Sequence, residues 1–181
     1  MRDTMKRIAD IFGLLLIVLP SCKNVEETGN YIPAKATLAY NYKNTAVPLD
    51  SLLLLLADND IRKVYKKRGY ITLWHNQEDR AALLKAIQEA ELDGLMPEDY
   101  NLSALKEFEA KTELSSEESA EYDVLLSETF QKFANHLFKG KVEPSEVYPD
   151  WDLKPKELNV EKLLTKALEE HTIQEAINSC R

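Results

Sequence analysis

The chain is poor in glycine and cysteine and has no apolar run long enough to span a membrane, and each shortage argues against a class of protein. Only five of its 181 residues are glycine, and none has the spacing of a loop that cradles nucleotide phosphates. Two cysteines do not make a disulfide framework. The apolar stretch at residues 11–19 is far shorter than the roughly 20 residues of a transmembrane helix.

Positive charge is also in the minority. Lysine and arginine total 23 against 31 aspartate and glutamate residues, which gives a formal net charge of -8 at pH 7. Contacts with nucleic-acid phosphates need clustered lysine and arginine, and the sequence has no basic stripe. We therefore expect no nucleic-acid partner.

The residues that could hold a metal ion lack the required spacing. Asp58 and Asp60 begin like a calcium-binding loop, but Lys63 stands where such a loop needs glycine. The three histidines lie far apart and have no cysteine partners; they are His75, His136 and His171. We expect neither a metal site nor a cofactor.

The first residues have the pattern of a bacterial lipoprotein signal peptide. Basic residues precede the apolar stretch at 11–19, which ends in the sequence Leu-Pro-Ser-Cys at 19–22. These four residues resemble a lipobox, in which Cys22 is lipidated and becomes the mature N-terminus. Residues 1–21 are therefore predicted to be a signal peptide, and Cys22 the membrane anchor. The alternative is a secretory leader without lipid and with an incidental cysteine.

The residues after Cys22 predict a location and a tether. By resemblance to bacterial lipoproteins, Lys23 in place of aspartate argues against retention in the inner membrane, so we expect a lipid-anchored envelope protein at the outer membrane, facing the periplasm. Residues 22–48 are polar and small, include Pro33 and Pro48, and have no sustained periodicity. This composition predicts a flexible tether.

Residues 49–181 are predicted to form one mostly α-helical, bundle-like domain. A capping box of Ser115 and Glu118 precedes an apolar period of 3.6 residues that runs to Gly140, which predicts the central helix of the core. Asn76 and Gly94 bound a second helix. Further helices are predicted from Asp60 to Gly69, from Asn159, and from a second capping box of Thr172 and Glu175.

Two short segments of this domain carry separate expectations. Five leucines follow Asp50, a possible N-cap, and are expected to form a buried helical turn at residues 52–56. Tyr70 to Trp74 have strand-like composition, so at most a short extended segment is expected there.

Motifs spread over residues 50–178 resemble the scaffold domain of large envelope L,D-transpeptidases. The first comprises Tyr65, Arg68, Gly69, Tyr70, Leu73 and Trp74, and the second Ala90, Asp93, Gly94, Leu95, Pro97, Asp99 and Tyr100. Three more are Asp123, Leu125, Leu126 and Phe130; Gly140, Lys141, Val142 and Pro144; and the run from Trp151 to the helix of Leu163. In that family, a mostly helical scaffold packs around a peptidoglycan-binding module and a β-rich domain that cross-links peptidoglycan stem peptides.

The resemblance does not extend to catalysis. The family builds its site around a Ser-His-Gly-Cys motif, whereas Ser179 directly precedes Cys180 here and no β-rich segment follows. We therefore expect no catalytic residue, a chain without enzymatic activity, and an exposed, unpaired thiol at Cys180. The resemblance implies a scaffold module, either truncated or retained to dock another envelope protein. The alternative is a stand-alone envelope lipoprotein that binds cell-wall glycan or a partner protein.

Aromatic residues and one arginine are the candidates for an interaction surface, because such side chains bind sugars and peptide carboxylates. The candidates are Arg68, Tyr70, Trp74, Tyr100, Tyr148 and Trp151. Peptidoglycan or a catalytic transpeptidase domain would be the partner, beside the membrane that holds the lipid. The alternative, which we favour, is that these side chains anchor loops to the core.

Overall fold

The computed structural model describes residues 42–55, 57–142 and 157–181. All of them belong to one contact-defined unit, Leu38–Arg181. None of the helices in these ranges combines the length and the apolar character needed to cross a bilayer. Several predicted features lie outside the described residues: the signal peptide, Cys22, the tether up to residue 41, Tyr148 and Trp151.

The described chain is mostly helical, as predicted. Its α-helices are α1 (Asn59–Lys67), α2 (Gln77–Gln88), α3 (Leu102–Ala110), α4 (Ser116–Lys139), α6 (Val160–Glu170) and α7 (Ile173–Asn178). Short 3-10 helices cover Tyr42–Asn44 and Ser51–Leu54 before α1, and Ala90–Asp93 and Pro97–Tyr100 between α2 and α3.

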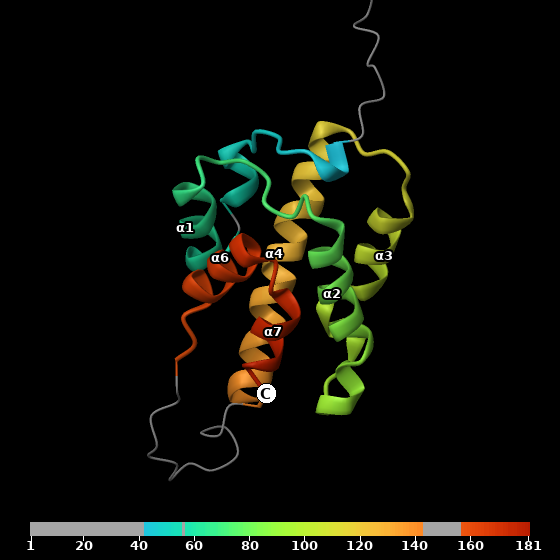
Figure 1. Ribbon diagram of the computed structural model, residues 1–181, viewed down its shortest axis with the longest axis vertical. Coiled ribbons are helices and arrows are strands. Elements are labelled where there is room, and N and C mark those ends of the chain that lie inside the picture. The colour runs from blue at the N-terminus through green and yellow to red at the C-terminus, as the bar shows by residue number, and fades with distance from the viewer. Residues whose placement is uncertain (1–41, 56, 143–156) are drawn as a thin grey trace, which may run out of the picture. The chain divides into compact units, whose positions relative to one another are not determined.

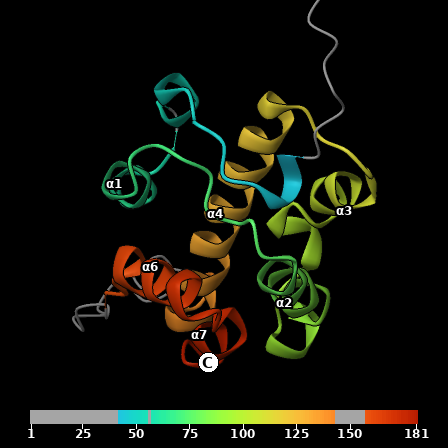
Figure 2. The ribbon, with the colours of Figure 1, turned by 45° about the horizontal axis from the view of Figure 1, so that its top comes forward.

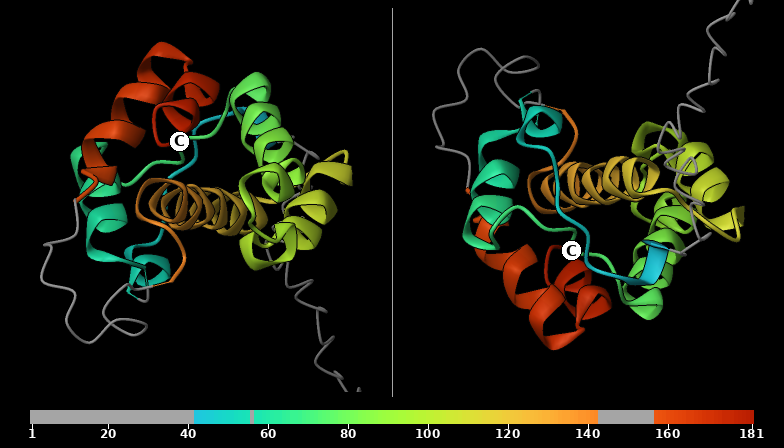
Figure 3. Two further views of the ribbon diagram at one scale, coloured as in Figure 1. Left: turned by 90° about the horizontal axis from the view of Figure 1, so that it is seen from below. Right: turned by 90° about the horizontal axis from the view of Figure 1, so that it is seen from above.

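Helix α4 lies at the centre, and the other helices surround it. Figure 1 shows α1 and α6 on one side of α4 and α2 and α3 on the other, and α7 contacts both α6 and α2. The view along α4 in Figure 3 shows the same arc of helices around its axis. Residues 42–55 cross the end where α4 begins, from the side of α3 to the side of α1 (Figure 2).

Most of the predicted helix ends are confirmed. The Ser115 hydroxyl and the Glu118 carboxylate form the reciprocal capping box that starts α4. The Asn76 side chain accepts the N–H groups of Glu78 and Asp79 in the first turn of α2, and the Asn159 side chain accepts the Lys162 N–H in the first turn of α6. Gly94 takes the left-handed conformation, with φ of 72°, after the 3-10 turn that extends α2.

The second predicted capping box was wrong. The Thr172 side chain makes no capping hydrogen bond to α7. Helix α6 ends at a left-handed His171, with φ of 55°, and the Thr172 N–H bonds back to Ala167 O at 2.9 Å. Thr172 therefore has φ of -121° and ψ of 39°, outside the extended conformation from which an N-cap side chain reaches the next turn.

The core is built on one face of α4. Phe130 and Phe133 are completely buried. The Trp74 ring lies 6.2 Å from the Phe130 ring, and the Tyr100 ring meets the Phe133 ring edge-on at 4.9 Å between centroids. The apolar period predicted from the sequence therefore forms the centre of the domain.

The segment predicted to be extended pairs with the end of the predicted tether. In the described chain it forms no strand, but Pro48 and Ile71 make one isolated antiparallel bridge. Leu49 N–H donates to Tyr70 O at 2.8 Å, and Thr72 N–H donates to Val47 O at 2.9 Å. Residues 42–48 thus pack against the domain, and its contacts begin before the predicted boundary at residue 49.

The turn predicted at residues 52–56 differs from the prediction in its described part, and Leu56 lies outside the described residues. We call residues 51–55 the leucine turn. Asp50 does cap it, because its carboxylate accepts the Leu52 N–H at 2.9 Å. Only Leu54 is buried, however, whereas Leu52 is 66% and Leu55 is 63% exposed. A 3-10 helix has three residues per turn, so consecutive side chains point in three directions and only one of them can face the core.

Replacing Phe130 with alanine should destabilise the domain by about 3–5 kcal/mol, because the truncation leaves a cavity beside Trp74. The free energy of unfolding is measured by denaturant titration. Leu92→Ala is the control, since Leu92 is 86% exposed and should change stability by no more than about 0.5 kcal/mol. Equal losses in the two variants would contradict the assignment of Phe130 to the core.

Candidate functional site

A buried carboxylate on α4 holds the connector between α1 and α2. Asp123 accepts the Trp74 N–H at 2.7 Å and the Leu73 N–H at 2.8 Å. It also accepts the Tyr65 hydroxyl at 2.7 Å. One turn further along α4, Ser127 Oγ lies 2.8 Å from the Tyr65 hydroxyl and accepts the Trp74 indole N–H at 2.9 Å. We call these five residues the Asp123 anchor.

Burial governs the protonation of this anchor. Asp123 is 4% exposed, and its removal from water raises the pKa of the carboxyl group to about 6, although hydrogen bonds from Tyr65, Trp74 and Leu73 favour the ionised form. Burial also raises the pKa of Tyr65 well above its usual value, with the Asp123 charge as the next cause. At neutral pH the anchor therefore consists of a carboxylate and a neutral phenol.

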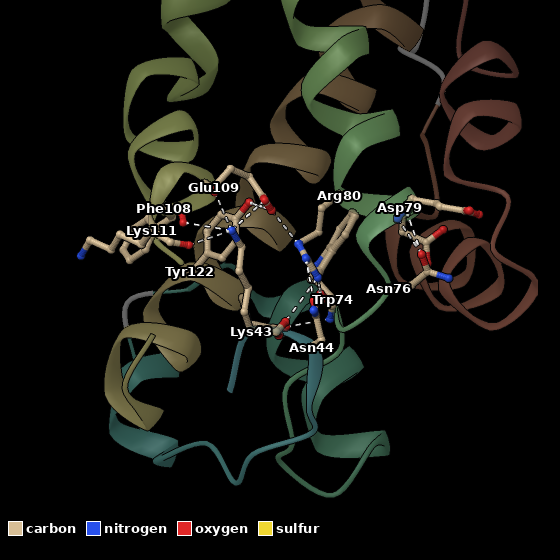
Figure 4. A network of polar contacts seen from close by, with 12 residues as sticks. Lys43, Asn44, Trp74, Asn76, Asp79, Arg80, Phe108, Glu109, Lys111 and Tyr122 are labelled. Carbon is tan, nitrogen blue, oxygen red and sulfur yellow. Dashed lines mark hydrogen bonds and ion pairs between the residues drawn. The ribbon is translucent and has the colours of Figure 1, made fainter. Parts of the chain in front are cut away.

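A second polar network joins the N-terminal segment to α2 and α3 (Figure 4). Arg80 on α2 is 1% exposed. Its guanidinium donates to Trp74 O at 2.7 Å, to Asn44 Oδ1 at 2.9 Å and to Glu109 Oε1 at 2.7 Å. Because the partners come from three separate segments, the arginine fixes their positions relative to α2.

Glu109 on α3 is the shared acceptor of this network. Lys43 Nζ lies 2.8 Å from its Oε2, and the Tyr122 hydroxyl donates to its Oε1 at 2.7 Å. Burial alone would raise the pKa of Glu109, but hydrogen bonds from Lys43, Tyr122 and Arg80 outweigh it and lower the pKa. The ionised carboxylate is thus matched by two cations, which is the condition under which buried charges are tolerated.

A third polar contact joins the start of α2 to the end of α6. Asp79 is 3% exposed, and its Oδ2 lies 2.7 Å from Nδ1 of the left-handed His171. The histidine ring itself is largely exposed. The contact is a structural hydrogen bond between elements far apart in sequence.

The sequence-derived candidates do not form one surface. Trp74 and Tyr100 are 2% and 0% exposed; Trp74 belongs to the Asp123 anchor, and the Tyr100 hydroxyl bonds His136 Nδ1 at 2.9 Å. Arg68 forms an ion pair with Glu169 at 3.0 Å. Tyr70 remains 38% exposed. Of the four candidates that the structure describes, Tyr70 and Arg68 are the ones accessible to a partner.

The expectation of an exposed thiol at Cys180 was wrong. Cys180 is 2% exposed, because α7 packs between α6 and α2 and carries the C-terminal turn inward. Its Sγ lies 3.4 Å from Ala176 O, and burial raises the pKa of the thiol. In the described part of the chain, no group of three or more histidine, cysteine, aspartate or glutamate residues could hold a metal ion.

Two shallow hollows flank the leucine turn. The first is lined by Leu52 and Leu53 together with Glu117 and Glu121 of α4. The second is lined by Leu54 and Leu55, by Tyr70, and by basic residues of α1, namely Arg62, Lys63 and Lys66. Exposed leucine side chains thus lie beside acidic residues of α4 on one side and basic residues of α1 on the other.

A comparison with known protein families assigns this domain to a family. A family model described as Scaffold domain matches residues 59–181. The chain belongs to this family. The match begins at the first residue of α1. It includes the whole Asp123 anchor together with Arg80 and Glu109, whereas Lys43 and Asn44 of the Arg80 network lie before it. Searches of the curated proteins and of the solved structures found no match.

Sequence reasoning missed most of the polar residues that organise this scaffold domain. Asp123 was part of a recognised motif, but its role as an acceptor for Leu73 and Trp74 was not predicted. The available signal was a pair of polar residues, Asp123 and Ser127, spaced by four on the apolar face of α4. Arg80 gave no such signal, since its acceptors other than Trp74 O lie 29 to 37 residues away in the sequence.

Asp123→Asn should lower the free energy of unfolding by about 1–3 kcal/mol at pH 7.5, because an amide group replaces an acceptor that faces three donors. The difference in the free energy of unfolding between the unaltered protein and this variant should then grow by about 1 kcal/mol at pH 5. A carboxyl group with a raised pKa binds its proton more tightly in the folded state, so its stabilising contribution is present at low pH and lost as the pH rises through 6.

Denaturant titrations of both proteins at the two pH values measure this difference. Asp60→Asn serves as the control, because Asp60 lies in the exposed first turn of α1. A deficit that shrinks between pH 7.5 and pH 5 would mean that the folded state lowers the pKa of Asp123, which contradicts the account.

Proposed function

We propose that this chain is the non-catalytic scaffold module of a murein L,D-transpeptidase system, held in the cell envelope by a lipid on Cys22. Membership of the Scaffold domain family supports the scaffold role. The transpeptidase context rests on the motifs at residues 65–74, 90–100 and 123–130, which resemble those of transpeptidase scaffolds.

The observation that carries the proposal is that three of these motifs meet in one folded core. Tyr65 and Trp74 come from the first motif, and both donate hydrogen bonds to Asp123 of the third. Tyr100, from the second motif, packs on Phe133 one turn beyond the third. Residues of the three motifs thus contact one another in one core. Such contacts are expected if the resemblance reflects a common scaffold fold.

A non-catalytic role agrees with the environment of Cys180, the cysteine whose Ser-Cys sequence partly resembles the transpeptidase motif. A cysteine nucleophile needs an accessible thiolate and an activating base. Cys180 is instead buried, its pKa is raised, and its described hydrogen bond is to a backbone carbonyl. We infer that the scaffold contributes binding and positioning, and that a separate β-rich domain contributes the chemistry.

The second candidate function is a stand-alone envelope lipoprotein that binds cell-wall glycan or a partner protein. The leucine turn favours it, because Leu52 and Leu55 are more than 60% exposed and exposed apolar patches mark interaction sites. Both candidates need a partner; they differ in whether it is a catalytic domain or the cell wall itself.

Binding and activity experiments on the chain from Lys23 onward test both candidate functions. The chain is mixed with a separately purified L,D-transpeptidase catalytic domain from the same organism, and with isolated peptidoglycan. Exchange of a labelled D-amino acid into muropeptides measures catalysis, size-exclusion chromatography measures complex formation, and sedimentation measures binding to peptidoglycan. Cys180→Ala is run beside the unaltered chain.

We expect no exchange by the chain alone, a complex with the catalytic domain, and faster exchange by that domain when the chain is present. Sedimentation with peptidoglycan without such a complex would establish the stand-alone function in its place. Exchange by the chain alone that Cys180→Ala abolishes would contradict both candidates.

A further inference from the structure

The leucine turn divides two hollows of opposite charge. On one side, Leu52 and Leu53 border a hollow with Glu117 and Glu121, which we call the acidic hollow. On the other side, Leu54 and Leu55 border the basic hollow. Between them stand Leu52 and Leu55, whose side chains are mostly exposed.

The charges of both hollows are available to a partner. Among the described residues, Arg62 and Lys66 of the basic hollow form no ion pair, and neither do Glu117 and Glu121 of the acidic hollow. Their neighbours on the same helices are already neutralised: Lys63 by Asp60 at 2.8 Å, and Glu118 by Lys111 at 2.6 Å. Each hollow thus presents two charged side chains that form no ion pair with a described residue, beside exposed leucine.

We propose that a second copy of this chain docks here, so that two leucine turns pack together in a symmetric dimer. A two-fold axis through the turn brings the acidic hollow of each protomer over the basic hollow of its partner. Such an isologous interface must be self-complementary, and an apolar centre between hollows of opposite sign meets that requirement. Tyr70, 38% exposed in the basic hollow, adds an aromatic contact of the kind enriched at interfaces.

The opposite charges of the two hollows favour a second copy of the chain over a membrane surface as the partner. An anionic lipid surface would attract Arg62 and Lys66 but would repel Glu117 and Glu121, which border the same leucines. A second copy supplies a basic hollow for each acidic one and covers both leucine turns. Charge complementarity therefore favours the dimer.

Sedimentation velocity of the chain from Lys23 onward tests the proposal. This chain contains every residue of the described hydrophobic core, which runs from Leu49 to Cys180, so we expect the domain to fold without the leader. We expect a concentration-dependent dimer. Leu52→Ser combined with Leu55→Ser should raise the dissociation constant at least about tenfold, because the contact loses its apolar centre.

The matched control is Leu92→Ser, which also removes an exposed leucine but lies on the 3-10 turn after α2. It should leave the dissociation constant unchanged. Circular dichroism of each variant reports whether the helices are intact, and the leucines in question contribute little to the monomer because they are exposed.

Charge reversal tests the orientation of the two copies. Arg62→Glu with Lys66→Glu makes both hollows acidic, and Glu117→Lys with Glu121→Lys makes both basic, so each variant alone should be monomeric. An equimolar mixture should form heterodimers that weaken as salt is added. Because a lysine at position 117 opposes the dipole of α4, the mixture is repeated with Glu121→Lys alone.

Three results of the sedimentation-velocity experiments would overturn the proposal: a monomer at every concentration, a dimer that the leucine variant leaves intact, or charge-reversed variants that do not pair when mixed. Sedimentation of a monomeric chain with phosphatidylglycerol vesicles, lost in the leucine variant, would assign the turn to a lipid surface and would also overturn it.

Discussion

The carboxylate of Asp123 accepts three donors that no helix or sheet satisfies, and the arrangement of the domain depends on it. The connector between α1 and α2 has no strand partner at Leu73 and Trp74, so their N–H groups, partly buried at Leu73 and buried at Trp74, need an acceptor. Asp123 provides it from the central helix. The same group bonds Tyr65 on α1, which fixes α1 and the connector on α4 together, and burial of the carboxylate is tolerable because it is so fully hydrogen-bonded.

The other polar networks extend this arrangement to the periphery. Arg80 binds the carbonyl of Trp74 and the carboxylate of Glu109, so the connector held by Asp123 also positions α2 against α3. Asp79 and His171 connect α2 to the end of α6. Apolar packing on α4 supplies most of the stabilisation, while these directional contacts select one arrangement of the surrounding helices. The leucine turn takes no part in these networks, and its Leu52 and Leu55 stay exposed.

Features set by neighbouring residues were predictable, and features set by distant ones were not. Capping at Ser115 and Asn76 depends on residues within one turn, and the burial of Phe130 follows from its place in a 3.6-residue period. The exposure of the leucine turn depends on its 3-10 geometry, which composition does not reveal. Cys180 was expected in solvent because it is next to the last residue, but the docking of α7 against α2 and α6 buries it.

Hydrogen exchange of the Leu73 and Trp74 amides, followed residue by residue by NMR, tests the role of Asp123 most directly. If the anchor holds the connector, these two amides exchange only when the whole domain unfolds, with protection equal to that of the buried amides in the middle of α4. Exchange at the rate of an open loop, while α4 stays protected, would mean that the connector opens freely and that the domain does not depend on this carboxylate.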